Sequence, residues 1–251
     1  MIGVIDRIRS GTIIGANVTM PHKGVAFENC DEACGLATAL RAVNTLYLSD
    51  DGLALGTNTD VHGVARSIAA LGCATGSIVL LGAGGAAAAA VAALATLECN
   101  LAVINRDAHR AQTMVERLDR AGLCPREVQV AEWGSSESRR QVRCADLVIN
   151  ATALGMGDQA LAGDSFRKLE IDRGESALLD LIYSIDETPF LKFGAGRSTL
   201  DGATMLVEQG ARSFELWTGR KAPLHEMYLA LFSHLGRAVP ALPQAESEGS
   251  R

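Results

Sequence analysis

The sequence predicts an α/β fold in two parts, and three observations lead to this prediction. From residue 77 onward, short apolar runs alternate with helical segments, a pattern typical of a parallel sheet covered by helices. A glycine-rich turn at 82–87 joins the first apolar run to an alanine-rich helix. Before residue 60 the chain has the pattern of short strands and helices around a hairpin. Together these patterns favour a Rossmann-like domain that follows a smaller α/β domain.

Composition narrows the classes of protein that fit. The chain has 251 residues, of which 48% are hydrophobic and 21% charged, so it can bury a large core and divide into two domains. The net charge of -6 gives no electrostatic reason to expect nucleic acid or an anionic membrane as a partner. The cysteines include no Cys-x-x-Cys pair and the start lacks a signal-like segment, which indicates a reduced, cytoplasmic chain. The histidines fall at unrelated spacings, so no metal site is predicted.

Domain boundaries follow from the same patterns. We expect residues 1–60 to form the first part of the smaller domain and residues 61–202 to form the Rossmann-like domain. Residues 203–237 have the amphipathic spacing of two helices, which we expect to cross back and pack on the first domain. The tail at 238–251 is rich in Pro, Ser and Glu and is predicted to be disordered.

One stretch near the start brings polar side chains out of an apolar run. Residues 13–14 are predicted to end a buried strand, and Pro21 stops the ladder because it lacks a backbone donor. The turn that follows would present Asn17, Thr19 and Lys23 in one direction. A lysine held beside a folded core can donate and accept a proton. An isolated Pro-x-Lys sequence, however, is more often a strand end with a solvated lysine.

The next segment is predicted to lead into a helix that begins near Asp60. Residues 25–40 have the spacing of two short helices, and 42–48 with 53–56 have that of a hairpin. The hairpin runs into an Asn-Thr-Asp sequence, in which Asp60 is placed to cap the helix at 61–71. Capping is the simpler interpretation of Asp60. It is compatible with catalysis, because a helix dipole keeps a carboxylate ionised.

The glycine-rich turn at 82–87 has the pattern of a dinucleotide site. It lies between an apolar strand and a helix, and a second strand follows at 101–104. Glycines let the backbone approach a pyrophosphate, and the free amides of the helix start supply donors. After the second strand, Arg106 and Arg110 favour NADP, because arginine suits its extra phosphate. Asp107 is the predicted N-cap of the following helix.

Further strands of the parallel sheet are predicted at 128–130, 147–149 and 177–183. Ligands of open α/β sheets bind beyond the carboxyl ends of the strands. The loop that contains Thr152 follows such an end, so ligand contact and an ordinary glycine-containing loop are both compatible with it. Tyr183 emerges at the end of its strand.

Two later positions complete the set of candidates. The Thr-Pro pair at 188–189 is predicted to start another helix, with proline at a tolerated first-turn position. Gln209 lies on the predicted helix at 203–217 among apolar side chains. A buried, hydrogen-bonded core glutamine and a ligand contact are equally compatible with that position.

Several of these short motifs combine into a resemblance. They occur in one order over almost the whole chain: Asn17-Val18-Thr19-x-Pro21-x-Lys23, Ala42-Val43-Asn44-Thr45, Asn58-Thr59-Asp60, the glycine turn at Gly82, Asn105-Arg106, Asn150-Ala151-Thr152, and Asp201-Gly202-x-x-Met205-Leu206 with Gln209. Together they resemble the shikimate dehydrogenase family, including its quinate-using relatives. The resemblance implies reversible, NADP-dependent reduction of 3-dehydroshikimate to shikimate, a step of aromatic amino acid biosynthesis. It also implies a cleft between a substrate domain and a nucleotide domain.

The resemblance implies roles for individual residues as well. Lys23 would transfer the proton at the carbonyl that becomes a hydroxyl, and Asp60 would bond to that hydroxyl and to Lys23. The positions that match substrate contacts are Asn17, Thr19, Asn44, Tyr183 and Gln209. The positions that match cofactor contacts are Gly82, Ala83, Gly84, Gly85, Ala86, Asn105, Arg106, Arg110, Thr152, Leu181 and Gly202. Because the cofactor carries the hydride, a lysine and aspartate pair suffices to move one proton.

Three departures from the family pattern bear on these expectations. The family's first strand, first helix and the serine pair that holds the substrate carboxylate have no counterpart, because the chain starts in the helix before residue 13. We therefore expect weaker substrate affinity and an exposed edge in the smaller sheet. Ala153 stands where serine or proline is common. Ile185 stands where proline is usual, which bears on how Tyr183 is presented.

Two alternative functions stay open from the sequence. The nearer one is a quinate or quinate/shikimate dehydrogenase that uses NAD, to which Gly210 and Asp107 give slight support. The other is a non-catalytic remnant that binds NADP without turnover, supported by the missing serine pair. The shikimate and quinate interpretations each imply a small-molecule substrate. The sequence is compatible with a monomer and with a homodimer.

Overall fold

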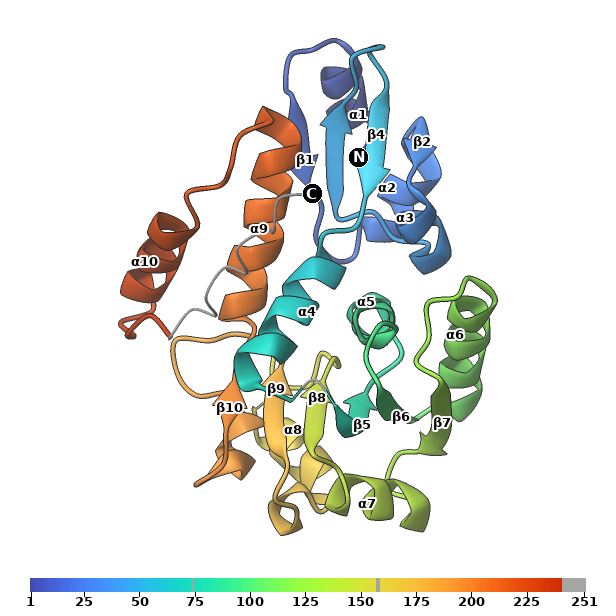
Figure 1. Cartoon of the computed structure of the whole chain (residues 1–251), viewed down its shortest axis with the longest axis vertical. Helices are drawn as coiled ribbons and strands as arrows, with labels where there is room; N and C mark the ends of the chain where they lie inside the picture. Colours follow the sequence, from blue (N-terminus) through green and yellow to red (C-terminus); the bar gives the residue numbers. More distant parts are fainter. Residues whose placement is uncertain (74, 157–158, 241–251) are drawn as a thin grey trace.

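Two sheets organise the chain, and the computed structural model describes residues 1–73, 75–156 and 159–240. The first sheet is small and mixed, and the second is a larger parallel sheet (Figure 1). Helices α4 and α9 lie side by side between them (Figure 1). The predicted α/β class, with a Rossmann-like sheet and a smaller sheet, is confirmed. Most of the predicted tail, residues 241–251, lies outside the described residues.

The smaller sheet has the strand order β1-β3-β4-β2. Its strands are β1 (Gly15–Asn17), β2 (Glu32–Ala33), β3 (Thr45–Leu48) and β4 (Ala54–Thr57). The predicted hairpin is the antiparallel pair of β3 and β4, and β2 joins β4 in parallel. Ile5 and Ile8 of α1 (Ile2–Arg9) are buried with Leu46, because their helical spacing directs both side chains onto the sheet.

Between β1 and β3 the chain forms the two short helices that the sequence predicts. They are α2 (Lys23–Asn29) and α3 (Gly35–Leu40), with β2 between them. Helix α3 ends at Arg41, which adopts a left-handed conformation with φ 53° and ψ 39°. The N–H of Arg41 donates to the carbonyl oxygens of Ala37 and Thr38, so it closes the last turn of the helix and redirects the chain toward β3.

The larger sheet has six strands, all paired in parallel, in the order β10-β9-β8-β5-β6-β7. Its strands are β5 (Gly76–Leu81), β6 (Cys99–Asn105), β7 (Glu127–Glu132), β8 (Leu147–Asn150), β9 (Ala177–Asp180) and β10 (Thr199–Leu200). The strand order reverses between β5 and β8. Ligands of open α/β sheets bind beyond the carboxyl ends of the strands at such a switch point.

Helices cover both faces of the larger sheet. On one face α4 (Asp60–Leu71), α5 (Gly85–Leu94) and α6 (Ala108–Arg120) share a core with the strands. Residues 87–94 of α5 are all buried, because their mostly alanine side chains let the helix pack closely against its neighbours. The other face is covered by α7 (Ser136–Arg143), α8 (Gln159–Arg167) and two short 3-10 helices (Ile171–Arg173 and Leu191–Gly194) around Phe166 and Phe190.

Helices α9 (Ala203–Thr218) and α10 (Leu224–His234) are the last two helices of the described residues. Helix α9 packs along α4 and also contacts β1 and β3, where the Nε1–H of Trp217 donates to the carbonyl oxygen of Leu46 at 2.9 Å. Helix α10 packs chiefly on α9, through an apolar cluster that includes Tyr228. Helix α9 therefore ties the smaller sheet to α4. None of the helices within the described residues is long and apolar enough to cross a membrane.

The prediction that residues 13–14 end a buried strand was wrong. Strand β1 begins at Gly15, and the side chain of Ile14 is 53% exposed. The N–H of Ile13 donates to the carbonyl oxygen of Arg7 in the turn after α1, so Ile13 is bonded to the helix end and not to a sheet partner.

The prediction that Asp60 caps its helix was also wrong. Thr59 occupies the N-cap position without a capping side-chain bond, and Asp60 is the first helical residue. The Asp60 carboxylate instead accepts hydrogen bonds from Lys23 and Asn44.

Two boundaries near the end of the larger sheet differ from the prediction. Strand β9 ends at Asp180, because the Asp180 carboxylate accepts the N–H of Ile182 and draws the backbone into a turn. The helix predicted from 188–189 is only the 3-10 helix at Leu191–Gly194. Thr188 acts there as a polar anchor, since its hydroxyl donates to Asp180.

Candidate active site

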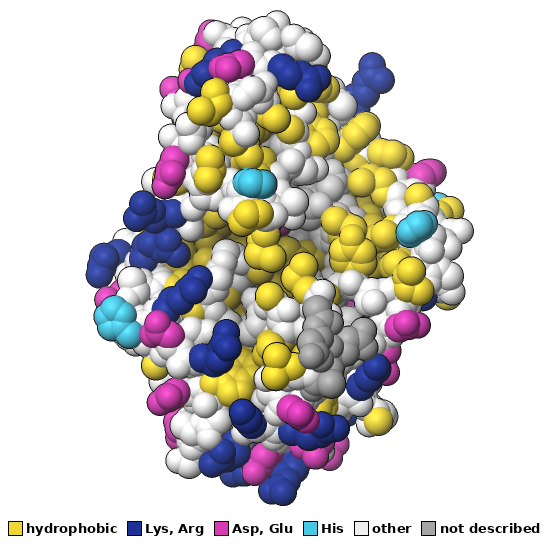
Figure 2. Space-filling view, turned by 180° about the vertical axis from the view of Figure 1, so that it is seen from behind, with side chains coloured by type: hydrophobic (Ala, Val, Ile, Leu, Met, Phe, Trp, Pro, Cys, Tyr) yellow, Lys and Arg dark blue, Asp and Glu magenta, His cyan; other side chains and the backbone are white. Residues whose placement is uncertain are grey.

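A cavity of about 1390 Å³ lies between the two sheets. One wall carries Thr19, Pro21 and Lys23, and the other carries the glycine turn and α6. Figure 2 shows the hollow from behind, with apolar side chains over much of its lining and Lys and Arg side chains gathered at its left rim. The glycine turn follows β5, so the cavity lies where the strand order of the larger sheet reverses.

Lys23 and Asp60 form an ion pair at the wall of this cavity. The Nζ of Lys23 lies 2.6 Å from the Oδ2 of Asp60, and their side chains are 21% and 6% exposed. Lys23 lines the cavity from the start of α2, and Asp60 lies behind it at the start of α4. A buried carboxylate thus holds an ammonium group at the cavity wall, the position from which it can exchange a proton with a bound ligand.

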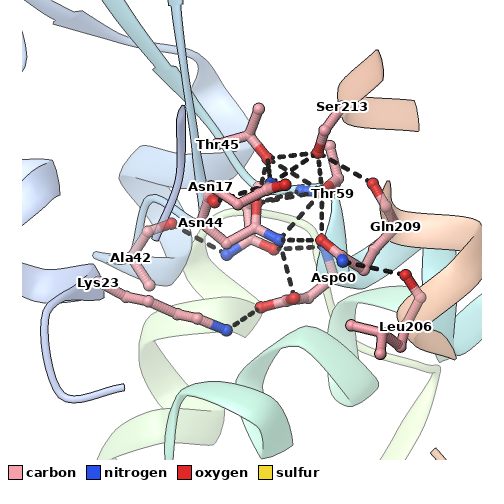
Figure 3. Close-up of polar contacts among 11 residues, drawn as sticks. Asn17, Lys23, Ala42, Asn44, Thr45, Thr59, Asp60, Leu206, Gln209 and Ser213 are labelled. Carbon is pink, nitrogen blue, oxygen red and sulfur yellow. Dashed lines mark hydrogen bonds and ion pairs between the residues drawn. The ribbon is translucent and has the colours of Figure 1, made fainter. Parts of the chain in front are cut away.

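Asn44 fixes the second oxygen of Asp60. Its Nδ2 donates to Oδ1 of Asp60 at 2.8 Å, and its own Oδ1 accepts the N–H of Thr59 at 2.7 Å (Figure 3). The N–H of Asp60 donates to the Oδ1 of Asn58 at 3.1 Å. Both carboxylate oxygens therefore have donors, and the carboxylate is held in one orientation toward Lys23.

A cluster of side chains from β1, β3, α4 and α9 surrounds Asn44. We call it the polar cluster, and its members are Asn17, Asn44, Thr45, Thr59, Gln209 and Ser213 (Figure 3). The Nδ2 of Asn17 donates to Ser213 Oγ at 2.9 Å and to Thr45 Oγ1 at 3.1 Å. The Oε1 of Gln209 accepts from Asn44 at 3.3 Å. The members of the cluster thus satisfy one another.

The predicted substrate residues fall into two groups. Thr19 and Tyr183 line the cavity, and the Tyr183 side chain is exposed at the end of the turn after β9. Asn17, Asn44 and Gln209 belong to the polar cluster, directly beside the Lys23–Asp60 pair. The structure therefore brings the predicted proton-transfer pair and three predicted substrate residues together.

The glycine turn forms the facing wall of the cavity. The residues that line it there are Ala83, Gly84, Gly85 and Ala86, at the start of α5. A Cβ on Gly84 or Gly85 would meet nothing within 4 Å, so the space in front of the helix start is open. The first N–H groups of a helix lack partners within the helix and favour an anion. This open turn fits the pyrophosphate of a dinucleotide.

Two other predicted cofactor residues allow close backbone approaches. Gly82 has a φ of +111°, which L side chains rarely adopt, and its Cβ would lie 3.1 Å from the carbonyl oxygen of Ala151. A Cβ on Gly202 would collide with the carbonyl oxygen of Leu181, which itself lines the cavity. These glycines thus shape the cavity wall through the backbone.

The predicted phosphate-binding residues are distributed around the start of α6. Arg110 lines the cavity, and its Nε donates to the carbonyl oxygen of Ala83 at 3.2 Å. Asp107 caps α6 as predicted, since its Oδ1 accepts the N–H of Arg110 at 3.0 Å. Asn105 donates to the carbonyl oxygen of Asp107 at 2.8 Å. Neither Asn105 nor the exposed Arg106 is among the described residues that line the cavity.

A buried carboxylate organises the loops beside the cavity. Asp180 is fully buried and accepts from Thr188 at 2.6 Å, Asn150 at 2.9 Å and the N–H of Ile182 at 3.1 Å. Burial raises the pKa of Asp180 to about 6. The three hydrogen bonds lower this pKa, but burial has the larger effect. The hydroxyl of Thr152 donates to the Oδ1 of Asn150 at 2.7 Å. Thr152 therefore holds the loop after β8 and is not among the described residues of the cavity lining.

Sequence reasoning missed three members of the polar cluster. Thr45 and Thr59 stand inside motifs that already singled out their neighbours, so the motifs contained the signal. Ser213 follows Gln209 by four residues on α9, and helical spacing places both side chains on one face. Ser213 could have been found once that face was known to meet the smaller sheet.

Two arginines of the cavity lining were missed as well. Arg117 follows Arg110 by two helical turns on α6, so both lie on one face of that helix. Arg41 has no local signal, because a left-handed arginine is uncommon and nothing in the sequence predicts one there. Among the described residues, no group of three or more His, Cys, Asp or Glu side chains could hold a metal ion.

Comparisons with known proteins agree with this geometry. The model of the shikimate dehydrogenase substrate binding domain matches residues 2–46, and that of the shikimate 5'-dehydrogenase C-terminal domain matches residues 202–232. A shikimate dehydrogenase (NADP(+)) from Oleidesulfovibrio alaskensis is 39% identical over 220 residues, which cover 84% of this chain and 72% of that protein. The chain belongs to the shikimate dehydrogenase family.

Solved structures of similar proteins share the fold of this family member. The shikimate 5-dehydrogenase of Thermus thermophilus, in complex with NADP(H) and shikimate, matches with a TM-score of 0.76 and 30% identity, over 92% of this chain and 82% of that one. The quinate dehydrogenase of Corynebacterium glutamicum, in complex with NAD, matches with a TM-score of 0.75 and 28% identity, over 93% of this chain and 82% of that one.

Proposed function

We propose that this member of the shikimate dehydrogenase family interconverts 3-dehydroshikimate and shikimate with NADP. The observation that carries the proposal is the Lys23–Asp60 ion pair, which lies in the wall of a cavity whose facing wall is the glycine turn. A proton-transfer group and a dinucleotide-binding turn thus face one space, as the reduction of a carbonyl requires. The name of the O. alaskensis relative and the ligands of the T. thermophilus structure support the same substrate and cofactor.

The residues of the nucleotide wall fit the phosphates of NADP. The N–H groups and dipole at the start of α5 favour the pyrophosphate beside Gly84 and Gly85. Arg106 and Arg110 supply guanidinium groups for the extra phosphate. Ala83, Ala86 and Leu181 line the wall around them, and we assign Gly82, Asn105, Thr152 and Gly202 to the backbone and loops behind it. When bound, NADP exchanges the hydride with the carbon that carries the reacting oxygen.

The residues of the opposite wall would carry out the proton transfer. Lys23 would donate a proton to the carbonyl oxygen in the reduction and accept one from the hydroxyl in the oxidation. Asp60 keeps the ammonium group at the cavity wall through its 2.6 Å contact, and Asn44 holds the other oxygen of Asp60. We assign Asp60 to this pair, and Asn17, Thr19, Asn44, Tyr183 and Gln209 to contacts with the substrate.

A division of the chain accompanies this proposal. Residues 1–60, together with 203–237, would form the substrate domain, and residues 61–202 would form the nucleotide domain. The contacts of α9 with β1 and β3 support the return of the chain to the first part. We further propose a cytoplasmic enzyme that works as a monomer or a homodimer. The free cysteines of the described residues fit a reducing compartment.

A quinate dehydrogenase that uses NAD is the second candidate function. The similar TM-score and identity of the C. glutamicum enzyme favour it, as does Asp107, since an acidic residue after the second strand suits the ribose hydroxyls of NAD. The Asp107 carboxylate, however, is engaged in capping α6 through the N–H of Arg110. Because Asp107 is engaged in this contact, the cofactor preference depends on Arg106 and Arg110, and these arginines favour NADP.

Absorbance of the reduced nicotinamide tests the proposal with four substrate pairs: shikimate or quinate, each with NADP or NAD. We expect the highest kcat/KM with shikimate and NADP. Replacing NADP with NAD should lower it at least about tenfold, because the arginines bind the extra phosphate through charge-assisted hydrogen bonds. A highest value with quinate and NAD would establish the second candidate. NADP binding without turnover of any pair would establish a non-catalytic remnant.

A further inference from the structure

Three arginines that line the cavity have no carboxylate partner among the described residues. They are Arg41, Arg110 and Arg117, and the ion pairs formed within the described residues include none of them. Arg110 stands beside the glycine turn, where the proposed function already uses it. Arg41 and Arg117 have no part in that function.

The chain holds Arg41 in a backbone conformation that L side chains rarely adopt. Its φ of 53° and ψ of 39° lie in the left-handed region, at the end of a helix, where glycine is the usual residue because it has no Cβ. The side chain is exposed and lines the cavity. An unfavourable backbone conformation at a cavity wall points to a role for the side chain it presents.

Arg117 has an unsatisfied donor inside the same wall. Its Nε is buried and has no hydrogen-bond partner within the described part of the chain. Burial lowers the pKa of the Arg117 guanidinium, and the neighbouring positive charge of Arg41 lowers it further. A buried donor without an acceptor costs free energy, and so does the approach of two like charges. An anion between the two guanidinium groups would relieve both costs.

The two arginines come from different parts of the fold. Arg41 ends α3, which belongs to the part with the smaller sheet, and Arg117 lies on α6, which covers the larger sheet. Helices α3 and α6 are in contact. Figure 2 shows the Lys and Arg side chains at the rim of the hollow on the side that α6 occupies. Since the whole chain has a net charge of -6, this local excess of cations is not a general property of its surface.

We propose that Arg41 and Arg117 form an anion site at the junction of α3 and α6 that takes a phosphate dianion. Guanidinium groups bind phosphate oxygens through paired N–H donors, and two of them match the charge of a phosphate dianion. The phosphate has two sources: free phosphate, and the extra phosphate of NADP, which Arg41 and Arg117 would then bind in addition to the arginines that the proposed function assigns to it. For the first source, the inference rests on the proposed function. The bound group would connect the two walls of the cavity.

Titration calorimetry on the full chain tests this site with inorganic phosphate, 2',5'-ADP and 5'-AMP as probes. The variants are Arg41→Gly and Arg117→Met. The control is Arg120→Met, which removes an exposed arginine of the same helix whose ion pair is with Glu116. The site recognises inorganic phosphate or 2',5'-ADP, and we expect both site variants to weaken the binding of that probe at least about tenfold. The control should keep the affinity for the same probe within about twofold of the parent. Arg41→Gly should also leave the melting temperature without ligand unchanged or higher, because glycine accepts the left-handed conformation.

Competition distinguishes the two sources of phosphate. If 2',5'-ADP displaces inorganic phosphate, the site binds the extra phosphate of NADP. The same conclusion follows if the binding of 2',5'-ADP depends on both arginines and the binding of inorganic phosphate does not. Inorganic phosphate that binds together with 2',5'-ADP assigns the site to free phosphate. Both results support the site.

Three results would overturn the inference. They are parent-like affinities for phosphate and 2',5'-ADP in both site variants, an equal loss in the Arg120→Met control, and an unmodified chain that binds neither probe. These titrations do not involve shikimate. The unmodified chain could fail to turn over shikimate while the substitution of Arg41 or Arg117 still abolishes its phosphate binding. That result would refute the proposed function and leave the anion site in place.

Discussion

The two walls of the cavity differ in whether their polar groups find hydrogen-bond partners within the chain. On the side of the smaller sheet, the polar cluster and the Lys23–Asp60 pair bond to one another at distances such as 2.6 and 2.8 Å. On the nucleotide side, Gly84 and Gly85 face open space, and the buried Nε of Arg117 has no partner within the described residues. The first wall is organised by the chain itself, and we propose that an anionic ligand completes the second. Most ligand-induced stabilisation should therefore come from the phosphates of the cofactor.

The two buried carboxylates beside the cavity sharpen this comparison. Asp60 is paired with Lys23, whereas Asp180 has three hydrogen bonds and no cationic partner among the described residues. The pKa of Asp180 is raised from 3.8 to about 6 by burial. The folded state thus binds this proton more tightly than the unfolded state. Its contribution to stability is present below the unfolded pKa and is lost as the pH rises through about 6.

The variant Asp180→Asn removes this titration and keeps a side chain that can bond to Asn150, Thr188 and the N–H of Ile182. Relative to the variant, the parent should lose about 2 kcal/mol of unfolding free energy between pH 4 and pH 7, since one pKa unit is worth about 1.4 kcal/mol and the titration has already begun at pH 4. Urea denaturation of both proteins across this range measures the difference. Parallel stability curves would show that Asp180 has an ordinary pKa.

One glycine substitution in each part of the fold should separate stability from cofactor binding. A Cβ on Gly15 would collide with the indole of Trp217, so Gly15→Ala should cost about 2 kcal/mol of unfolding free energy through overpacking. Gly84→Ala meets nothing within 4 Å and should change stability by less than about 0.5 kcal/mol. It should nonetheless weaken NADP binding about tenfold or more, because the backbone must approach the pyrophosphate closely.

Urea denaturation and NADPH fluorescence titration of the two variants separate these effects. If Gly84→Ala lost as much stability as Gly15→Ala, the nucleotide wall would be closely packed in the free protein. The contrast between the two walls would then be wrong.

Ser213→Ala tests whether the polar cluster is a connected unit. The hydroxyl of Ser213 accepts from Asn17 at 2.9 Å and lies 2.8 Å from the hydroxyl of Thr45. Its loss should cost about 1 kcal/mol of stability, because it leaves part of the hydrogen-bonding capacity of the buried cluster unmet. The KM for shikimate should rise severalfold, because Asn17 loses the hydrogen-bond acceptor that holds its side chain.

Thr218→Ala is the matched control for this prediction. Thr218 lies on the same helix, and its hydroxyl donates to the carbonyl oxygen of Phe214 at 2.8 Å, outside the polar cluster. A control that loses as much stability and raises KM as much as Ser213→Ala would mean that the cluster has no special role.

Local patterns predicted the elements well where neighbours along the chain decide them. The apolar run of β5, the glycine turn and the alanine-rich helix α5 are of this kind, as is the cap of α6 by Asp107. The predictions failed where a distant side chain decides. Asp60 does not cap α4, because Lys23 and Asn44 take its oxygens, and the helix near 188–189 is reduced because Thr188 anchors to Asp180.

The candidate site shows the same limit. Motifs singled out Lys23, Asp60 and Asn44, but their mutual contacts depend on how α2, α4 and the hairpin pack. Ser213 joins them only because α9 docks along α4 and the smaller sheet. The left-handed Arg41 depends on the exit of the chain from α3, which sequence patterns do not determine.

The kcat for shikimate oxidation with NADP, measured together with NADPH affinity for the parent and Lys23→Met, tests the central claim most directly. The methionine keeps most of the lysine's length and removes the proton that Asp60 holds at the cavity wall. The account predicts a loss of kcat of at least about 100-fold, the usual range for a general acid or base, with NADPH affinity within about twofold of the parent. A Lys23→Met protein that keeps more than about one tenth of the parent kcat would contradict the account.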